Sequence, residues 1–265
     1  MAVITISRGS FSGGRMLAER TAARLGYRCL DRDAIVEKAA AYGVSHQGLR
    51  DALERPPTIG DRFRHTKYVY LSLIQAALVE GVRDGNAVYH GNAGHLLLRG
   101  VTHVMRARIV APMAFRIAAV QSQHPLSADE AAAHIRKVDQ DRQKWAHYLY
   151  GIDWSDASLY DLVLNLEHLT VDQACEIIAA TARQSAFKET PASRAAMLDL
   201  ALASRVQAHL AVGRGTLHLE VDVTARDGLV VVRGTWSNRA QAEDVRAAVV
   251  GLPGVAGVDV EPAAT

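Results

Sequence analysis

The alternation of apolar and polar positions predicts a strand, a turn and a helix at the beginning of the chain. Residues 3–6 form a short β-branched run that is typical of a buried parallel strand. Residues 7–14 are rich in Gly and Ser, and residues 15–25 carry a helical apolar face that ends at Gly26. Residues 27–30 read as a second strand, so the chain opens as a βαβ unit.

The same alternation continues to residue 187. Strands are expected at residues 87–90, 107–110 and 162–164, and helices at residues 68–82, 114–123, 127–148 and 171–186. Ser127 and Glu130 have the spacing of a capping box at the start of the long third helix. This order predicts an α/β fold with a mostly parallel sheet flanked by helices.

A polar segment with Pro191 divides the chain into domains 1–187 and 194–265, joined by a linker at residues 188–193. The second domain is expected to be a small α+β structure of order α-β-β-α-β, with a hairpin turn at Asp227-Gly228. Its elements are a helix at 194–212, strands at 216–223, 229–232 and 255–260, and a helix beginning at Asn238.

Composition and charge exclude several classes of protein. The 30 Lys+Arg and 28 Asp+Glu give a net charge of +2, too balanced to indicate a nucleic-acid partner. Cys29 and Cys175 lie far apart, which favours a reducing cytoplasm over a disulfide-bonded exterior. No run reaches the roughly 18 apolar residues of a membrane helix, and the N-terminus lacks a signal-peptide pattern. We therefore expect a cytoplasmic location.

The glycine-rich loop has the context of a phosphate-binding site, because it lies between a buried strand and a helix. The residues expected to hold phosphate are Gly9, Ser10, Ser12, Gly13 and Gly14. Arg15 can neutralise the phosphates, but it stands where a Walker A motif has Lys, and Met16 replaces the hydroxyl that binds Mg²⁺. The metal ligands thus stay unknown, and a plain turn that needs glycines is the alternative.

Residues 4–8, 12–15 and 30–32 together resemble the cytidylate kinase-like family, in which Arg after the Gly-Gly pair is common. The resemblance continues in order through residues 88–91, 108–112, 139–142 and 160–165. It covers residues 1–187 and implies a P-loop-type fold, ATP and Mg²⁺ as cofactors, and a nucleotide substrate.

The resemblance implies a lid segment at residues 139–142. Arg142 would close over the transferring group, with Asp139 and Asp141 as orienting carboxylates, so Arg15, Arg142 and Asp139 are the expected catalytic residues. An ion pair between Asp139 and Arg142 within the helix is the structural alternative.

The acceptor is expected at the carboxyl ends of the strands, where open α/β sheets bind ligands. Arg8, Asp31 and Arg32 lie there, and Asp141 adds a lid carboxylate. Asn92 stands where the family usually has Arg, and it completes the expected substrate-binding set.

The C-terminal segment resembles a BON domain over residues 200–261, on the basis of Asp227-Gly228 and the Pro253-Gly254-Val255 step. The resemblance implies binding of a small ligand, a lipid surface or a protein partner; a passive or dimerising role, and hence a homo-oligomer, is the alternative.

Three functions follow from these patterns. An ATP-dependent nucleoside monophosphate kinase of cytidylate type is favoured by Arg15, Arg142 and the motif order. A catalytically degenerate nucleotide-binding or sensory protein, acting through its BON domain, is favoured by Met16 and Asn92. A membrane-surface or envelope adaptor, in which the BON domain dominates, is the third.

Overall fold

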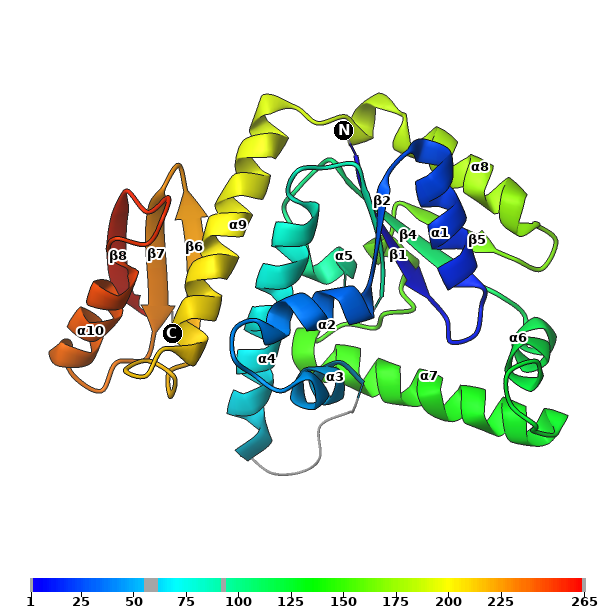
Figure 1. Ribbon diagram of the computed structural model, residues 1–265, viewed down its shortest axis with the longest axis horizontal. Helices are drawn as coiled ribbons and strands as arrows, with labels where there is room; N and C mark the ends of the chain where they lie inside the picture. The colour runs from blue at the N-terminus through cyan, green and yellow to red at the C-terminus, as the bar shows by residue number, and fades with distance from the viewer. Residues whose placement is uncertain (1, 55–61, 92–93, 264–265) are drawn as a thin grey trace. The chain divides into compact units, whose positions relative to one another are not determined.

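The computed structural model describes residues 2–54, 62–91 and 94–263, and the chain forms two compact units (Figure 1). The first unit contains Met1–Ala34, Glu54–Pro57 and Asp84–Thr190, and the second contains Ile35–Leu53, Thr58–Arg83 and Pro191–Thr265. The second unit is therefore discontinuous in sequence, because three separate segments of the chain contribute to it.

The first unit is built on a five-stranded parallel sheet with the order β2-β3-β1-β4-β5. Its strands are β1 (Val3–Arg8), β2 (Arg28–Asp31), β3 (Ala87–His90), β4 (Val104–Val110) and β5 (Leu162–Asn165). The central strands β1 and β3 are buried almost throughout, as their β-branched and apolar sequences require. The predicted α/β fold is thus confirmed.

Two helices, α1 (Gly14–Leu25) and α8 (Val171–Ala182), pack against one face of this sheet (Figure 1). Their core includes Leu17 and Ile178 packed near Met105 of β4. Gly26 ends α1 with a φ of 67°, a left-handed conformation that glycine adopts at little cost, so the predicted helix stop is confirmed.

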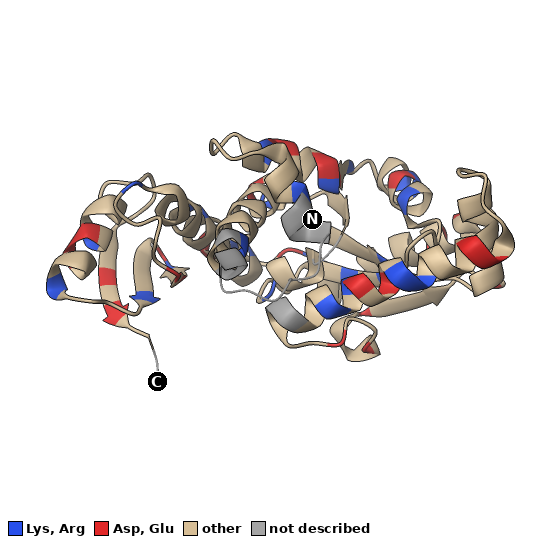
Figure 2. Ribbon diagram, turned by 90° about the horizontal axis from the view of Figure 1, so that it is seen from below, with Lys and Arg blue, Asp and Glu red and all other residues tan. Residues whose placement is uncertain are grey.

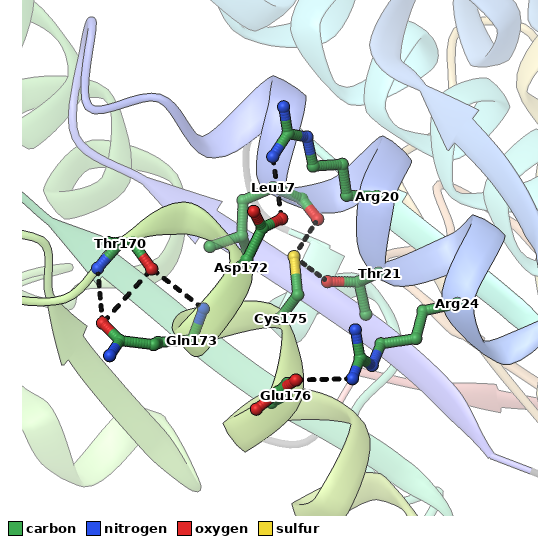
Figure 3. A network of polar contacts seen from close by, with 9 residues as sticks. All are labelled: Leu17, Arg20, Thr21, Arg24, Thr170, Asp172, Gln173, Cys175 and Glu176. Atoms are coloured by element: carbon green, nitrogen blue, oxygen red, sulfur yellow. Dashed lines mark hydrogen bonds and ion pairs between the residues drawn. The ribbon is translucent and has the colours of Figure 1, made fainter.

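Polar contacts fix how α1 lies on α8 (Figure 3). Arg20 and Asp172 form an ion pair of 2.7 Å, and Arg24 pairs with Glu176 at 2.6 Å. Between them the Thr21 hydroxyl contacts the buried Sγ of Cys175 at 3.4 Å. Exposed ion pairs add little stability, so this seam mainly orients α1 and the loop that precedes it.

A helical pair follows β4, consisting of α6 (Met113–Gln121) and α7 (Ala128–Tyr150). The capping box predicted at Ser127 and Glu130 is present at the start of α7. Val120, Ala131 and Ile135 form a small apolar cluster between the two helices. Three short elements complete the first unit, namely α5 (Gly94–Leu97), η1 (Ala157–Leu159) and η2 (Ser185–Phe187).

The second unit combines helices with a three-stranded sheet of order β6-β7-β8. Its elements are α3 (His46–Glu54), α4 (Arg62–Val82), α9 (Pro191–Val212), β6 (Val221–Arg226), β7 (Leu229–Gly234), α10 (Arg239–Val249) and β8 (Gly257–Pro262), while α2 (Arg32–Ala40) spans the boundary between the units. Strands β6 and β7 are antiparallel and β7 and β8 are parallel, which confirms the small α+β fold.

The C-terminal hairpin has the predicted turn, but its first strand begins later than predicted. Asp227 and Gly228 have φ values of 49° and 83°, the positive pair of a type I′ turn. The prediction of a strand from residue 216 was wrong, because the Thr216 hydroxyl donates to the Leu210 carbonyl at 2.6 Å and closes the end of α9. Pairing therefore starts only at Val221.

Helix α4 packs alongside α9 within the second unit (Figure 1). The Tyr68 hydroxyl donates to the Val221 carbonyl at 2.9 Å and accepts from the Val221 amide at 3.1 Å. The single side chain thus satisfies both backbone groups of the first residue of β6. Helix α4 was predicted, but nothing in its sequence indicated that it belongs with the C-terminal sheet.

Basic and acidic residues are interspersed along the helices, as Figure 2 shows, in keeping with the balanced net charge. Among the residues that the structure describes, no helix combines the length and hydropathy needed to cross a bilayer.

Candidate functional site

The loop between β1 and α1 depends on two glycines. Gly13 precedes α1 with a φ of 76°, and a Cβ on Gly14 would lie 2.8 Å from the Cβ of Arg8. A larger residue at either position would therefore strain the backbone or displace Arg8. The loop delivers the chain directly into α1, whose first-turn amides have no helical acceptor and can bind an anion.

Ser10 joins the loop to both helices of the α6–α7 pair. Its hydroxyl donates to the Asp139 carboxylate at 2.6 Å and accepts from the Arg116 guanidinium at 2.6 Å. Arg116 also donates to the Ser10 carbonyl at 2.7 Å and forms an ion pair of 2.6 Å with Asp139. Ser12 bonds within the loop, to the Gly9 carbonyl at 2.9 Å. Sequence reasoning missed Arg116, because its partners lie far away in the chain.

Phe11 is a second tie between the loop and the helical pair. It has a φ of 58°, a left-handed conformation that costs a non-glycine residue about 1–2 kcal/mol. Its ring lies 5.5 Å from that of His134 and packs against the apolar cluster of α6 and α7. The packing of this ring offsets the strain and fastens the loop to α7.

Arg8 and Arg142 lie beside the loop, and among the described residues neither forms an ion pair with a carboxylate. Arg142 of α7 donates to the Arg8 carbonyl at 3.3 Å. Burial, followed by repulsion from Arg8, lowers the pKa of Arg142 to about 10. Burial and the charges of Arg32 and Arg15 likewise lower the pKa of Arg8. Cations that repel one another in a buried position mark a site that is stabilised by binding an anion.

Arg15 is engaged elsewhere in this arrangement. Its Nε donates to Glu19 at 2.8 Å on the exposed side of α1, and this hydrogen bond raises the pKa of Arg15. The neighbouring Met16 is half exposed. Of the two expected lid and loop cations, the structure therefore places Arg142 against the loop and leaves Arg15 paired with Glu19.

The expected acceptor residues are only partly brought together. Asp31 ends β2 and its carboxylate accepts from the Ala34 amide at 2.8 Å, which caps α2, while Arg32 lies near enough to repel Arg8 and Arg142. Asp141 instead pairs with Lys137 at 3.3 Å along α7. Asn92 lies outside the described residues.

Asp139 bonds to Ser10 and Arg116, so its carboxylate connects the loop to the α6–α7 pair. These two partners, rather than Arg142 as in the alternative of an ion pair within the helix, bind the Asp139 carboxylate.

The donor set does not form a resident magnesium site. Met16 offers no oxygen at the position after Arg15, and the Ser10 hydroxyl is bonded to Asp139 and Arg116. Within the described part of the chain, no group of three or more His, Cys, Asp or Glu could hold a metal ion. Any Mg²⁺ would depend mainly on phosphate and water oxygens, which is a common arrangement for this ion.

A cavity of about 340 Å³ opens beside the loop. Among the residues that line it are Gly9, Arg108, Arg116, Arg136, Gln143 and Trp154. Arg108 is buried on β4, where it donates to the Trp154 carbonyl at 2.5 Å and lies 4.8 Å from the centre of the Trp154 ring. An arginine inside the otherwise apolar run 107–110 was the sequence signal for this position.

His95 is the other unusual group in the interior of the first unit. It is 5% exposed, and its ring lies 4.8 Å from that of Tyr160. Neither ring nitrogen has a hydrogen-bond partner among the residues that the structure describes. Burial, and then the charges of Arg99, Arg106 and Arg108, lower the pKa of His95 to about 4. It is therefore a neutral ring at pH 7.

Two family models match this chain. Residues 3–168 match the model of the cytidylate kinase-like family, and residues 199–261 match the model of the BON domain. The first match includes the loop, the arginines around it and the α6–α7 pair.

Individual proteins agree with the first match. A cytidylate kinase of Thermococcus kodakarensis is 26% identical over 179 residues, which cover 67% of this chain and 86% of that protein. A cytidylate kinase of Pyrococcus horikoshii is 25% identical, with the same coverage of 67% and 86%. The solved structure of an uncharacterised protein from Eubacterium ventriosum has a TM-score of 0.54 and 16% identity, covering 68% of this chain and 97% of that one, a likeness of fold alone.

Proposed function

Because the chain belongs to the cytidylate kinase-like family, we propose that its first unit transfers the γ-phosphoryl group of ATP to a nucleoside monophosphate. The observation that carries this proposal is the convergence of Arg8 and Arg142 on the glycine loop. Burial, followed by repulsion from Arg8, lowers the pKa of Arg142, and burial together with the charges of Arg32 and Arg15 lowers the pKa of Arg8. A polyanion such as a triphosphate would therefore stabilise the site.

The transfer needs positioning and charge stabilisation and little covalent help from the protein. A phosphate oxygen of the acceptor forms a bond to the γ-phosphorus of ATP as the bond to the β–γ bridging oxygen breaks. That oxygen leaves with the electron pair on ADP, and the acceptor becomes a diphosphate with no net proton transfer. The first-turn amides of α1 would bind the donor phosphates, while Arg142 and Arg8 would stabilise charge on the moving group.

Two expected contributions belong to this proposal as well. Arg15 would join the donor phosphates after leaving Glu19, and Asp31 and Arg32 would meet the acceptor at the end of β2. Mg²⁺ would supply charge neutralisation on the donor phosphates when bound. The relatives named cytidylate kinase make cytidine monophosphate the first acceptor to test.

A second candidate function is nucleotide binding without transfer, in which the C-terminal unit would pass the bound state to a ligand, a lipid surface or a protein partner. The pairing of Arg15 with Glu19 and the presence of Met16 favour it. A phosphate loop usually offers a cation and a hydroxyl at these two positions, and here the cation is paired and the hydroxyl is missing.

Product formation separates the two functions. The full chain would be incubated with ATP, Mg²⁺ and each of CMP, UMP, AMP and GMP, and diphosphates would be separated by chromatography. We expect a diphosphate from one acceptor, lost in Arg142→Met and retained in Lys144→Met, which removes a charge from the exposed side of the same helix. ATP binding without a diphosphate from any acceptor would favour the second function.

A further inference from the structure

Trp154 lies on the turn that follows α7, and it lines the cavity beside the glycine loop. Gly151 ends α7 with a φ of 64°, a left-handed conformation that lets the chain leave the helix. The Asp153 carboxylate then accepts from the amide of Ser155 at 2.8 Å and from its hydroxyl at 2.6 Å. Such bonds are how Asp stabilises a tight turn, so local structure defines the segment that carries the indole.

Contacts with the sheet hold Trp154 in place. Its carbonyl accepts from Arg108 at 2.5 Å and from the Tyr160 hydroxyl at 2.8 Å. The Arg108 guanidinium also lies over the indole ring, 4.8 Å from its centre. The Tyr160 hydroxyl lies 3.4 Å from that of Ser7, so the anchorage extends to β1 and β4, which are paired in the sheet. Both the backbone and the ring of Trp154 are therefore fixed.

Arg142 of α7 lies over the same ring, with its guanidinium carbon 6.0 Å from the ring centre. It also donates to the Arg8 carbonyl at 3.3 Å, and among the described residues it forms no ion pair. The Asp139 carboxylate lies one turn earlier on α7, but it binds Ser10 and Arg116. The contacts that orient Arg142 are thus a carbonyl and an aromatic face.

An aromatic face supports a guanidinium differently from a carboxylate. A carboxylate binds the N–H edge of the guanidinium and neutralises its charge, so a phosphate would have to displace it. A ring attracts the cation through its π face and does not occupy the N–H groups in the guanidinium plane. An arginine held by a ring therefore keeps both its charge and its donors for a phosphate.

We propose that Trp154 is a positioning residue for phosphoryl transfer, whose indole ring holds the Arg142 guanidinium beside the loop with donors free for a phosphate oxygen. It acts through Arg142 and is not itself a catalytic residue. The inference rests on the proposed function, in which Arg142 stabilises charge on the moving phosphoryl group.

A double-mutant cycle with Arg142 tests this dependence. The kcat for phosphoryl transfer is measured in the parent, Trp154→Leu, Arg142→Met and the double variant. We expect Trp154→Leu to lower kcat about tenfold in the parent, as loss of a desolvated cation–π contact does, and to have no further effect in Arg142→Met. An equal fall in both backgrounds, or an unchanged kcat in Trp154→Leu, would overturn the proposal.

Two further variants separate the ring from general packing. Trp154→Phe keeps an aromatic face, so kcat should recover to within about threefold of the parent. Trp236→Leu removes an indole of the second unit, whose N–H donates to the Glu261 carbonyl, and it should leave kcat unaltered. A Phe variant as slow as Trp154→Leu, or an equally slow Trp236→Leu, would assign the effect to packing or stability and reject the proposal.

Thermal unfolding with tripolyphosphate makes the same comparison without turnover. The anion should raise the Tm of the parent more than that of Trp154→Leu, whereas Arg142→Met and the double variant should respond equally. This pattern, together with no diphosphate from any monophosphate, would support the positioning of Arg142 by Trp154 and reject the proposed function. The same response to the anion in the parent and in Trp154→Leu would overturn the proposal.

Discussion

The two units differ in what they bury. The first unit encloses Arg142, whose buried charge opposes folding, and His95, whose ring nitrogens have no hydrogen-bond partner among the described residues. The core of the second unit is apolar, and its residues include Val206, Val223, Val230, Val232, Val245 and Val249. Groups that destabilise the folded state are thus concentrated in the unit where we place a ligand, and the comparison separates residues kept for binding from residues kept for stability.

The largest expected effect is that of Arg142→Met. We expect kcat for phosphoryl transfer to fall about 10³-fold, in the range known for arginines that stabilise a transferring phosphoryl group. Thermal stability should rise instead, by roughly 1–3 kcal/mol, because the pKa of Arg142 is lowered to about 10. A cation with a lowered pKa destabilises the fold at every pH below that value, so removing it is stabilising at pH 7.

Differential scanning fluorimetry of the parent protein and of Arg142→Met, with and without tripolyphosphate, measures the effect of the buried charge on stability. The anion should stabilise the parent protein more than the variant. A variant that is less stable than the parent, with an equal response to the anion, would contradict the idea that the buried charge is kept for a ligand.

The next effect is a loss of folding stability caused by His95, and it appears only at acidic pH. Its pKa is lowered to about 4, so between pH 6.5 and 4 the unfolded chain binds a proton that the folded chain does not. Stability is therefore lost as the pH falls through this window, by about 2–3 kcal/mol in total. His95→Leu should reduce the pH dependence of the urea denaturation midpoint. His124→Leu, a change at an exposed histidine, should leave that pH dependence unaltered. A parallel loss in all three proteins would assign the acid sensitivity to other groups.

The smallest expected effect lies in the second unit. Tyr68→Phe removes the hydroxyl that bonds to the amide and the carbonyl of Val221, and we expect a loss of about 1–2 kcal/mol in the free energy of unfolding. Urea denaturation measures it, with Tyr42→Phe, a change at an exposed tyrosine, as a control. Because this change removes a polar contact made within the second unit, kcat should be unaltered, and a large fall in kcat would weaken the distinction between the two units.

Local patterns predicted most of the secondary structure and the parallel sheet. The run at residues 3–6, the capping box at Ser127 and the turn at Asp227-Gly228 are short-range features, so the sequence carries them directly. The start of the first C-terminal strand was predicted too early, because the alternation beginning at residue 216 also suits a segment that closes a helix.

The candidate site was less predictable, because its contacts join distant segments. Arg116 reaches Ser10 across 106 residues, and Arg108 reaches the Trp154 carbonyl across 46. The loop glycines were identifiable by type and spacing, and Arg142 was identified through the resemblance to the family. Phe11 could be noticed in sequence, yet only the structure shows that its left-handed backbone and packed ring tie the loop to α7.

The long separation in sequence between two segments of the second unit has a consequence for biosynthesis. Helix α4 ends at Val82 and its packing partner α9 begins at Pro191, so roughly 110 residues separate their emergence from the ribosome. At translation rates of about 5–20 residues per second, the side of α4 that packs on α9 stays uncovered for roughly 5–20 s in the nascent chain. During that interval α4 has been synthesised but its packing partner α9 has not. Chaperone binding during synthesis is therefore expected to concentrate on α4.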